Sequence, residues 1–277
     1  MRIAFQGEPG AYSETAALRF APGAEVLACR SFEAVFAAVA EGRATRGILP
    51  MENSIGGSIH RNYDLLVQHE LPVVGEVELA VDHCLLVRPG ARIEDLKVVY
   101  SHPQALAQCE EHLARMAGVE IVAVYDTAGG AKMVAEGERR DAGAVASRRA
   151  AEVFGLEVAQ ETIQDYAENI TRFVVIGRTP AAAEEATKTA LVFALQSTPG
   201  ALHKALSGFA LRDINLTKLE SRPIRGRPWE YMFYVDVDAP RQSLPCGRAI
   251  SHLGEFSHWV RTLGSYPAWT RGPRDPL

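Results

Sequence analysis

The sequence predicts an α/β protein that continues into a smaller βαββαβ domain. Short apolar runs alternate with helical patterns through residue 178, which is typical of an α/β sheet. The composition then changes at 179–188, an Ala/Glu/Thr/Pro-containing stretch without strand character that we interpret as a linker. After the linker the pattern reads strand, helix, strand, strand, helix, strand, which suits a ferredoxin-like sandwich.

The elements of the first part follow from apolar runs and from helical periodicity. In 31–41, for example, Phe32, Val35, Phe36 and Val39 fall on one helical face. The first cycle is predicted as strand 2–5, helix 12–20, helix 31–41, strand 47–50, helix 59–69 and strand 78–87. A second cycle gives strand 98–100, helix 103–116, strand 121–125, helix 128–136, and strands 142–146 and 173–176.

The second part is predicted as strand 189–196, helix 200–211, strands 215–222 and 229–237, a helix over about 249–260, and a short strand near 263. A turn at 225–228 joins the two central strands. Pro245 and Gly247 oppose helix, so we expect the second helix to be short or to begin late. The tail 269–277 is rich in Pro, Arg and Gly and is expected to be frayed.

Composition limits the classes of function. The net charge of −5 over 277 residues argues against a general nucleic-acid binder. The N-terminus enters a strand directly and no apolar run approaches membrane-spanning length, so we expect neither a signal peptide nor a membrane span. The four cysteines are scattered without metal-ligand spacing, which predicts buried free thiols, no metal site and a cytoplasmic location.

Four strand-to-helix junctions repeat one local pattern, in which a small polar residue follows a buried strand. They lie at 7–13, 52–58, 101–104 and 126–130, and Ser101 reads as the cap of the third helix. Helix N-termini that meet at one sheet edge suit carboxylates or phosphates. The sequence holds neither a dinucleotide fingerprint nor a phosphate-binding loop, so we expect carboxylate ligands and no cofactor. These junctions alone leave open a small-acid binding protein or an enzyme.

The segment Asn169–Phe173 carries the most specific chemistry. Arg172 can hold a carboxylate through two parallel hydrogen bonds, and Thr171 offers an adjacent hydroxyl donor. On these residues alone, a surface ion pair and a strand-edge turn are equally compatible with the pattern.

The string NITRF at 169–173 resembles the signature of the prephenate dehydratases, a family that includes the arogenate dehydratases. Further motifs of that family occur in order at 7–13, 50–57, 101–105, 126–129, 199–202, 220–223 and 264–267, so the resemblance covers about residues 1–267. It implies a catalytic domain over 1–178 with two lobes, built like a periplasmic binding protein. One lobe takes about 1–77 and 168–178, the other about 78–167. An ACT regulatory domain is implied over 189–268.

The resemblance also implies roles for residues. Thr171 would supply the hydrogen bond or proton that the departing oxygen needs, Arg172 would grip the substrate, and Glu52 is the rival proton donor. The residues expected to bind substrate are Asn53, Ser54, Ser101, Gln104, Thr127, Asn169 and Phe173. His102 and Cys109 are interpreted as structural.

In the ACT domain, the resemblance implies that phenylalanine binds at an interface between two copies. The expected residues are Gly200, Ala201, Leu202, Glu220, Ser221, Arg222 and Pro223. A homodimer or homotetramer is therefore expected, because βαββαβ units commonly pair across a two-fold axis.

The function so implied is the decarboxylating dehydration of prephenate to phenylpyruvate under feedback by phenylalanine. Losing carbon dioxide and the hydroxyl makes the ring aromatic, so no redox group or metal is required. The nearest alternative is an arogenate dehydratase, which carries out the same chemistry on the amino form of the side chain. A non-catalytic sensor of carboxylates or amino acids is the alternative from another class; it would need the arginine but not the Thr171 hydroxyl.

Overall fold

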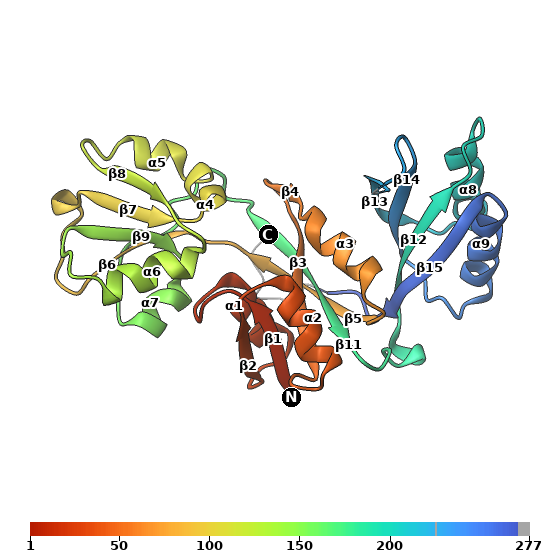
Figure 1. Ribbon diagram of the computed structural model, residues 1–277, viewed down its shortest axis with the longest axis horizontal. Helices are drawn as coiled ribbons and strands as arrows, with labels where there is room; N and C mark the ends of the chain where they lie inside the picture. The colour runs from red at the N-terminus through yellow and green to blue at the C-terminus, as the bar shows by residue number, and fades with distance from the viewer. Residues whose placement is uncertain (225, 271–277) are drawn as a thin grey trace. The chain divides into compact units, whose positions relative to one another are not determined.

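The computed structural model describes residues 1–224 and 226–270 (Figure 1). Contacts between Cα atoms divide the described chain into two compact units. The first unit contains Met1–Asn62 and Val77–Phe173, and the second contains Tyr63–Glu76 and Val174–Thr270. Arg225 of the predicted turn, and the part of the predicted tail from 271 onward, lie outside the described residues.

The first sheet has the strand order β2-β1-β3-β11-β5, with β4 paired to β3. Its strands are β1 (Arg2–Gln6), β2 (Glu25–Cys29), β3 (Arg46–Asn53), β4 (Gly57–Ser58), β5 (Val73–Ala80) and β11 (Ile170–Gly177). The helices of this part are α1 (Tyr12–Phe20), α2 (Phe32–Ala40) and α3 (His60–Gln68). Helix α2 starts one residue after the predicted position, because Ser31 is its cap and the Ser31 side chain accepts a hydrogen bond from the Ala34 amide.

The second sheet has the order β10-β6-β9-β7-β8. Its strands are β6 (Cys84–Val87), β7 (Val98–Ser101), β8 (Glu120–Ala123), β9 (Ala142–Ala146) and β10 (Glu157–Gln160). The helices are α4 (Pro103–Ala107), α5 (Glu110–Ala114), α6 (Thr127–Glu136) and α7 (Arg148–Phe154). Leu85, Val99, Cys109 and Val145 lie in the core under this sheet. The predicted two-sheet α/β architecture is confirmed.

Several boundaries differ from the prediction for tertiary reasons. The predicted strand 78–87 is two strands, β5 and β6, which belong to different sheets. The predicted helix 103–116 breaks after α4, because the Gln108 carbonyl accepts from the Asp165 amide instead of from the next helical turn. No helix starts at Asn53–Ser54: β3 runs to Asn53 and turns back into β4, and α3 begins only at His60. The elements β2, β4, α7 and β10 were not predicted.

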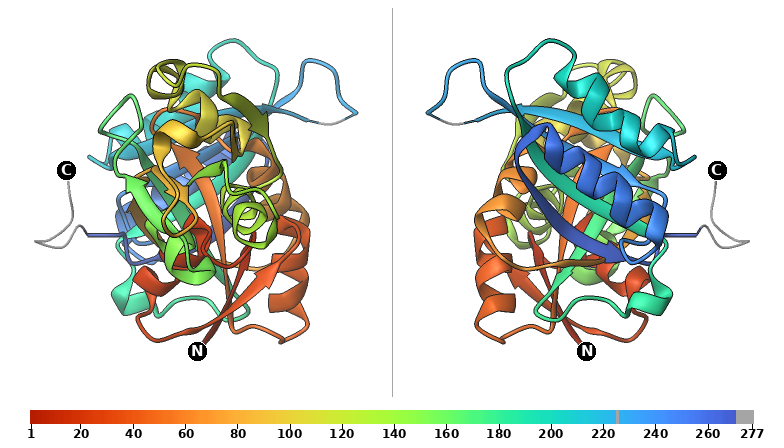
Figure 2. Two further views of the ribbon diagram at one scale, coloured as in Figure 1. Left: turned by 90° about the vertical axis from the view of Figure 1, so that its left-hand side faces the viewer. Right: turned by 90° about the vertical axis from the view of Figure 1, so that its right-hand side faces the viewer.

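The second unit contains the predicted βαββαβ sequence of elements, which is confirmed. It consists of β12 (Lys188–Leu195), α8 (Ala201–Ala210), β13 (Leu216–Pro223), β14 (Tyr231–Val237), α9 (Leu244–Glu255) and β15 (Ser257–Tyr266). The strands form an antiparallel sheet in the order β13-β14-β12-β15. Helices α8 and α9 cover one face of it (Figure 2). Within the predicted linker, Ala183–Glu185 forms a 3₁₀ turn.

The expectation of a late second helix is wrong. Helix α9 begins at Leu244, with the Ser243 hydroxyl accepting from the Cys246 amide. Pro245 falls in the first turn, where a residue without an N–H costs no helical hydrogen bond. The proline therefore helps to start the helix that it was expected to oppose.

The sheet face opposite α8 and α9 contacts the C-terminal part of α3. Because side chains alternate along a strand, Tyr234 points away from the core residues Val235 and Val237. The Tyr234 hydroxyl donates to the Tyr63 carbonyl at 2.9 Å, and the two rings form an edge-to-face pair. Arg222 Nη2 lies 3.2 Å from Asp64 Oδ2 in the same layer.

Candidate active site

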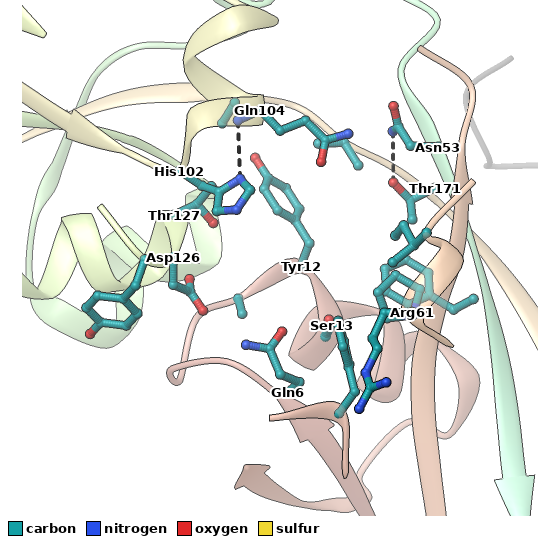
Figure 3. A pocket seen from close by; sticks show the side chains of 18 of the residues that line it. Gln6, Tyr12, Ser13, Asn53, Arg61, His102, Gln104, Asp126, Thr127 and Thr171 are labelled. Atoms are coloured by element: carbon teal, nitrogen blue, oxygen red, sulfur yellow. Dashed lines mark hydrogen bonds between the residues drawn. The ribbon is translucent and has the colours of Figure 1, made fainter. Parts of the chain in front are cut away.

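The candidate site is a cleft of about 520 Å³ in the first unit (Figure 3). Its lining side chains come from strands β1, β3 and β11 of the first sheet, from helices, and from loops next to the strands of both sheets. The polar and charged lining residues are Gln6, Tyr12, Ser13, Arg30, Ser31, Glu33, Asn53, Arg61, His83, His102, Gln104, Gln108, Tyr125, Asp126, Thr127 and Thr171. A cleft of this size suits a small ligand.

The structure brings together only part of the predicted set. Asn53, Gln104, Thr127, Thr171 and Phe173 line the cleft. The remaining predicted residues, which do not line it, are Glu52, Ser54, Ser101, Asn169 and Arg172.

Strand alternation explains why Glu52 and Arg172 stay outside. In β11, Thr171 and Phe173 share the face that borders the cleft, so Arg172 between them points to the other face. The same alternation separates Asn53 from Glu52 in β3. Both charged residues take part in interactions of their own. This placement does not support a direct grip on the substrate by Arg172.

The two predicted serines have structural partners. Ser54 Oγ donates to the Glu168 carbonyl at 2.7 Å and accepts from the Ile170 amide at 2.9 Å. Ser101 is fully buried, and its Oγ donates to the Val145 carbonyl at 2.6 Å. The prediction that Ser101 caps α4 is wrong, because the cap is His102, whose Nδ1 accepts from the Gln104 amide.

Thr171 is held by Asn53, and the direction of their hydrogen bond follows from the backbone. Asn53 Oδ1 accepts from the amides of Ile55 and Gly56 at 3.1 and 2.7 Å. Backbone amides only donate, so the other amide atom, Nδ2, must face Thr171, at 3.0 Å from Oγ1. Thr171 Oγ1 therefore accepts from Asn53. Its own hydrogen can then be donated to a ligand in the cleft.

Behind Asn53 lies a buried polar network that the sequence did not predict. Gln108 Nε2 donates to Asn53 Oδ1 at 3.1 Å, and Gln108 Oε1 accepts from Asn169 Nδ2 at 2.9 Å. Asn53 Nδ2 also donates to Asn169 Oδ1 at 2.6 Å. Asn169 is thus a support for the site and not part of its wall. In the sequence, Gln108 directly precedes Cys109, which was expected to be buried. That position was the available signal that the Gln108 side chain is also buried.

Two predicted helix N-termini are already occupied by protein side chains. At α6, Asp126 Oδ1 accepts from the Ala128 amide at 2.7 Å, and burial raises the pKa of Asp126. At α4, His102 takes the Gln104 amide. Helix α1 has no such side-chain cap, and Ala11, Tyr12 and Ser13 at its start line the cleft. The positive end of α1 therefore remains directed at the site.

Two arginines of the cleft wall were also missed. Arg30 lies just before α2, and Arg61 lies in the first turn of α3. Arg61 Nε donates to Glu33 Oε1 at 2.8 Å, and Glu33 has a lowered pKa, chiefly through its own backbone amide and then through Arg61. In the sequence, Arg30 and Arg61 each lie next to the start of a predicted helix, and this position was the signal that could have indicated their place in the cleft wall. Arg30 and Arg61 line the cleft, whereas Arg172 does not.

The cysteines do not supply a nucleophile. All four are buried and free of disulfides, as predicted. Burial raises the pKa of Cys29, Cys84 and Cys246, and raises that of Cys109 to about 12, so each thiol stays protonated. In 1–224 and 226–270, no group of three or more His, Cys, Asp or Glu side chains is arranged to hold a metal ion. No helix in the same described ranges has the length and apolar character to cross a membrane.

Comparison with known proteins identifies both parts of the chain. The profile of the prephenate dehydratase family matches residues 3–181, and that of the ACT domain matches residues 189–243. A relative from Arabidopsis thaliana, arogenate dehydratase/prephenate dehydratase 2, is 49% identical, over 98% of this chain and 74% of its own length. Arogenate dehydratase 2 of Petunia hybrida is also 49% identical, over 97% of this chain and 72% of its own length.

Two solved structures resemble nearly the whole chain. Prephenate dehydratase from Arthrobacter aurescens in complex with L-Phe is 29% identical with a TM-score of 0.87, covering 100% of this chain and 92% of that one. A protein described as a quorum quenching acylase, GqqA, is 39% identical with a TM-score of 0.89, covering 97% of this chain and 98% of that one.

The predicted cytoplasmic location is contradicted by this comparison. The Arabidopsis relatives numbered 1 and 2, at 47% and 49% identity, are both named as chloroplastic proteins. The prediction rested on thiol usage and on the absence of a leader. Free thiols do not distinguish one reducing compartment from another, so the sequence pattern could not support the location.

Proposed function

From the premise that this chain belongs to the prephenate dehydratase family and is a hydro-lyase, we propose that its preferred substrate is arogenate, with prephenate as a second substrate. The relatives at 49% identity are named arogenate dehydratases, one of them also as a prephenate dehydratase. Both substrates lose carbon dioxide and a ring hydroxyl, and they differ only in the amino or keto group of the side chain. This preference replaces prephenate as the leading substrate.

The observation that carries the dehydratase proposal is the Asn53–Thr171 pair. The Asn53 amide fills the acceptor side of the Thr171 hydroxyl at 3.0 Å, which leaves its hydrogen to bond the departing ring oxygen. That bond strengthens as negative charge develops on the oxygen, so it favours the transition state over the bound substrate. Thr171 is the proposed catalytic donor, and Glu52, which does not line the cleft, is no longer favoured.

The substrate carboxylates have three sources of positive potential in the cleft. Arg30 and Arg61 line it, and so does the uncapped start of α1 at Tyr12 and Ser13. Phe173 and the other apolar wall residues border the same space, where a carboxylate that departs as carbon dioxide is poorly solvated. The arrangement supports a substrate with two carboxylates, held at one end and activated at the other.

Direct assay tests this proposal. We expect the purified protein to convert arogenate to phenylalanine, and prephenate to phenylpyruvate with a lower kcat/KM. The two products are separated by chromatography after matched incubations. No product from either substrate would contradict the dehydratase assignment, and a higher kcat/KM for prephenate would contradict the preference. An N-acyl amide serves as a third substrate, because a relative at 39% identity is described as an acylase.

Regulation by phenylalanine is the second part of the proposal. Gly200, Ala201 and Leu202 line a cavity of about 440 Å³ in the second unit, but Glu220–Pro223 do not. Within one chain the two expected effector segments therefore do not line the same cavity. We infer that a second copy completes the site, which supports a homodimer or a homotetramer built from such dimers.

We propose the same domain boundaries as in the sequence analysis: a catalytic domain over 1–178, a linker over 179–188 and an ACT domain over 189–268.

Helix α3 offers a route from the effector segment to the cleft. Asp64 in its second turn pairs with Arg222 of the effector segment, and both side chains are largely buried. Three residues earlier on the same helix, Arg61 lines the cleft. A change at Arg222 would therefore act on a helix that also carries a cation of the active site. Coupling of this kind requires that phenylalanine bind one state of the helix better than another.

We expect Asp64→Asn to weaken the response to phenylalanine by at least about 5-fold in the concentration that halves activity. The substitution removes the charge partner of Arg222 and leaves Arg61 in place. Dehydratase rates measured over a phenylalanine titration report the shift. Glu70→Gln, an exposed residue beyond the end of α3, is the matched control. An unchanged phenylalanine response in Asp64→Asn would contradict the coupling.

A further inference from the structure

His83 lies at the inner end of the polar network that holds Thr171. It is only 2% exposed and immediately precedes β6. Its Nε2 lies 2.9 Å from Gln108 Oε1, and its Nδ1 lies 2.9 Å from the Tyr12 hydroxyl. The His83 and Tyr12 rings pack edge to face with centroids 5.5 Å apart. The imidazole is therefore held from both sides.

The donor and acceptor atoms of this network can be assigned one after another, starting from the backbone amides that bond to Asn53. Asn53 Oδ1 is an acceptor because the amides of Ile55 and Gly56 donate to it. Gln108 must then present its Nε2 to that oxygen, at 3.1 Å, so its Oε1 faces His83. A carbonyl oxygen only accepts, and His83 Nε2 must carry a hydrogen.

The bond to Gln108 is independent of the charge on His83. In the neutral ring with Nε2–H, Nδ1 accepts from the Tyr12 hydroxyl, whose single hydrogen it shares with the Asp82 carbonyl 2.8 Å from the same oxygen. In the charged ring, Nδ1 donates to that oxygen and the hydroxyl donates to Asp82. Nε2 donates to Gln108 in both states. Burial lowers the pKa of His83, while Gln108 and Asp82 oppose that shift. Tyr12, with a raised pKa, and the thiols Cys84 and Cys109 stay protonated around the ring.

We propose that His83 is a positioning residue for the dehydratase reaction: through Gln108 it tightens the hold of Asn53 on the Thr171 hydroxyl, whose direction the backbone amides of Ile55 and Gly56 set. Without the Nε2 donor, Gln108 Oε1 keeps only Asn169 Nδ2 at 2.9 Å, and the amide can turn. Such a turn would place Gln108 Oε1 against Asn53 Oδ1, and two acceptors repel. Asn53 Oδ1 would then keep its two backbone donors but lose the third, Gln108 Nε2, and the hold of Asn53 on Thr171 would loosen. This role rests on the dehydratase function proposed above.

The proposal differs from acid–base catalysis by His83 and from simple core packing. An acid–base residue would need a ring nitrogen open to the ligand, whereas Nε2 is bonded to Gln108 and Nδ1 to the Tyr12 hydroxyl. A packing residue would affect folding stability without a specific loss of turnover. Glutamine can present an amide N–H near the position of Nε2, so it tests the donor separately from the ring.

The experiment compares His83→Leu and His83→Gln with the unsubstituted full-length protein. For His83→Leu we expect a loss of kcat of about 10-fold to 100-fold, as for other small displacements of reacting groups, with KM unchanged within about 2-fold. We expect His83→Gln to recover most of the lost kcat and to keep the shape of the pH–rate profile. Thermal unfolding of each variant checks that it is folded, and ¹⁵N NMR of the imidazole reports which ring nitrogen carries the hydrogen.

Several results would overturn the proposal. They are full activity in His83→Leu, equal losses in the two variants, loss of a limb of the pH profile in His83→Gln, or an Nδ1–H tautomer in the NMR spectrum. If His83→Leu does not fold, the kinetics of His83→Gln and the NMR spectrum of the unsubstituted protein still test the proposal. Failure of the dehydratase function itself would show separately, as a lack of turnover in the unsubstituted protein.

Discussion

Replacing Thr171 by valine should lower turnover by at least about 10²-fold while leaving substrate affinity nearly unchanged. Valine keeps the shape of the side chain but removes the hydroxyl that faces the departing oxygen. Because that hydrogen bond strengthens mainly in the transition state, its loss appears in kcat and not in binding. Steady-state kinetics with arogenate and prephenate, together with the affinity of an unreactive substrate analogue, separate the two quantities.

Thr171→Ser is the matched control, since it restores the hydroxyl and keeps the acceptor for Asn53 Nδ2. It should retain most of the activity. Stability should change little in either variant, because Asn53 Nδ2 keeps a second acceptor in Asn169 Oδ1 at 2.6 Å. Near-normal turnover in Thr171→Val would remove Thr171 from the mechanism and return attention to the other cleft hydroxyls.

Replacing Gly264 by alanine should destabilise the second unit by about 3 kcal/mol or more. A Cβ atom at this position would lie 2.1 Å from the Val73 carbonyl oxygen and 2.8 Å from its carbonyl carbon. Both atoms are backbone and cannot rotate away. Gly264 is also paired with Ala190 of β12, so β15 cannot move aside without breaking its sheet. Chemical denaturation followed by circular dichroism measures the change.

Gly254 provides the contrast within the same domain. It lies in α9, and a Cβ there would meet no atom within 4 Å. Gly254→Ala should therefore be neutral or stabilise the protein by up to about 1 kcal/mol, because alanine favours helix over glycine. A Gly264→Ala protein as stable as Gly254→Ala would show that β15 and Val73 can separate at little cost.

The periodicity of apolar residues predicted the helices and strands that are determined by their own local sequence. Helix α1 lies at the predicted residues, and α2 differs from its prediction by one residue at each end. The breaks depended on partners far away in the sequence. The carbonyl of Gln108 is taken by Asp165, which ends α4 early, and no local pattern around Gln108 could show that contact. Pro245 shows the opposite case, in which a helix breaker becomes compatible with helix at the first turn.

The family could be read from the sequence, and so could the proposed role of the Thr171 hydroxyl, because both depend on residue identity in ordered motifs. NITRF alone placed Thr171 at the centre of the hypothesis. Which neighbour serves Thr171 was decided only by tertiary structure. Strand pleating turns Thr171 into the cleft and Arg172 away from it, and strands β3 and β11 bring Asn53 to Thr171 across 118 residues of chain. Tertiary structure also decided that Arg30 and Arg61 line the cleft and that Gln108 bonds to His83. These contacts join residues that are distant in the sequence, so sequence order could not show them.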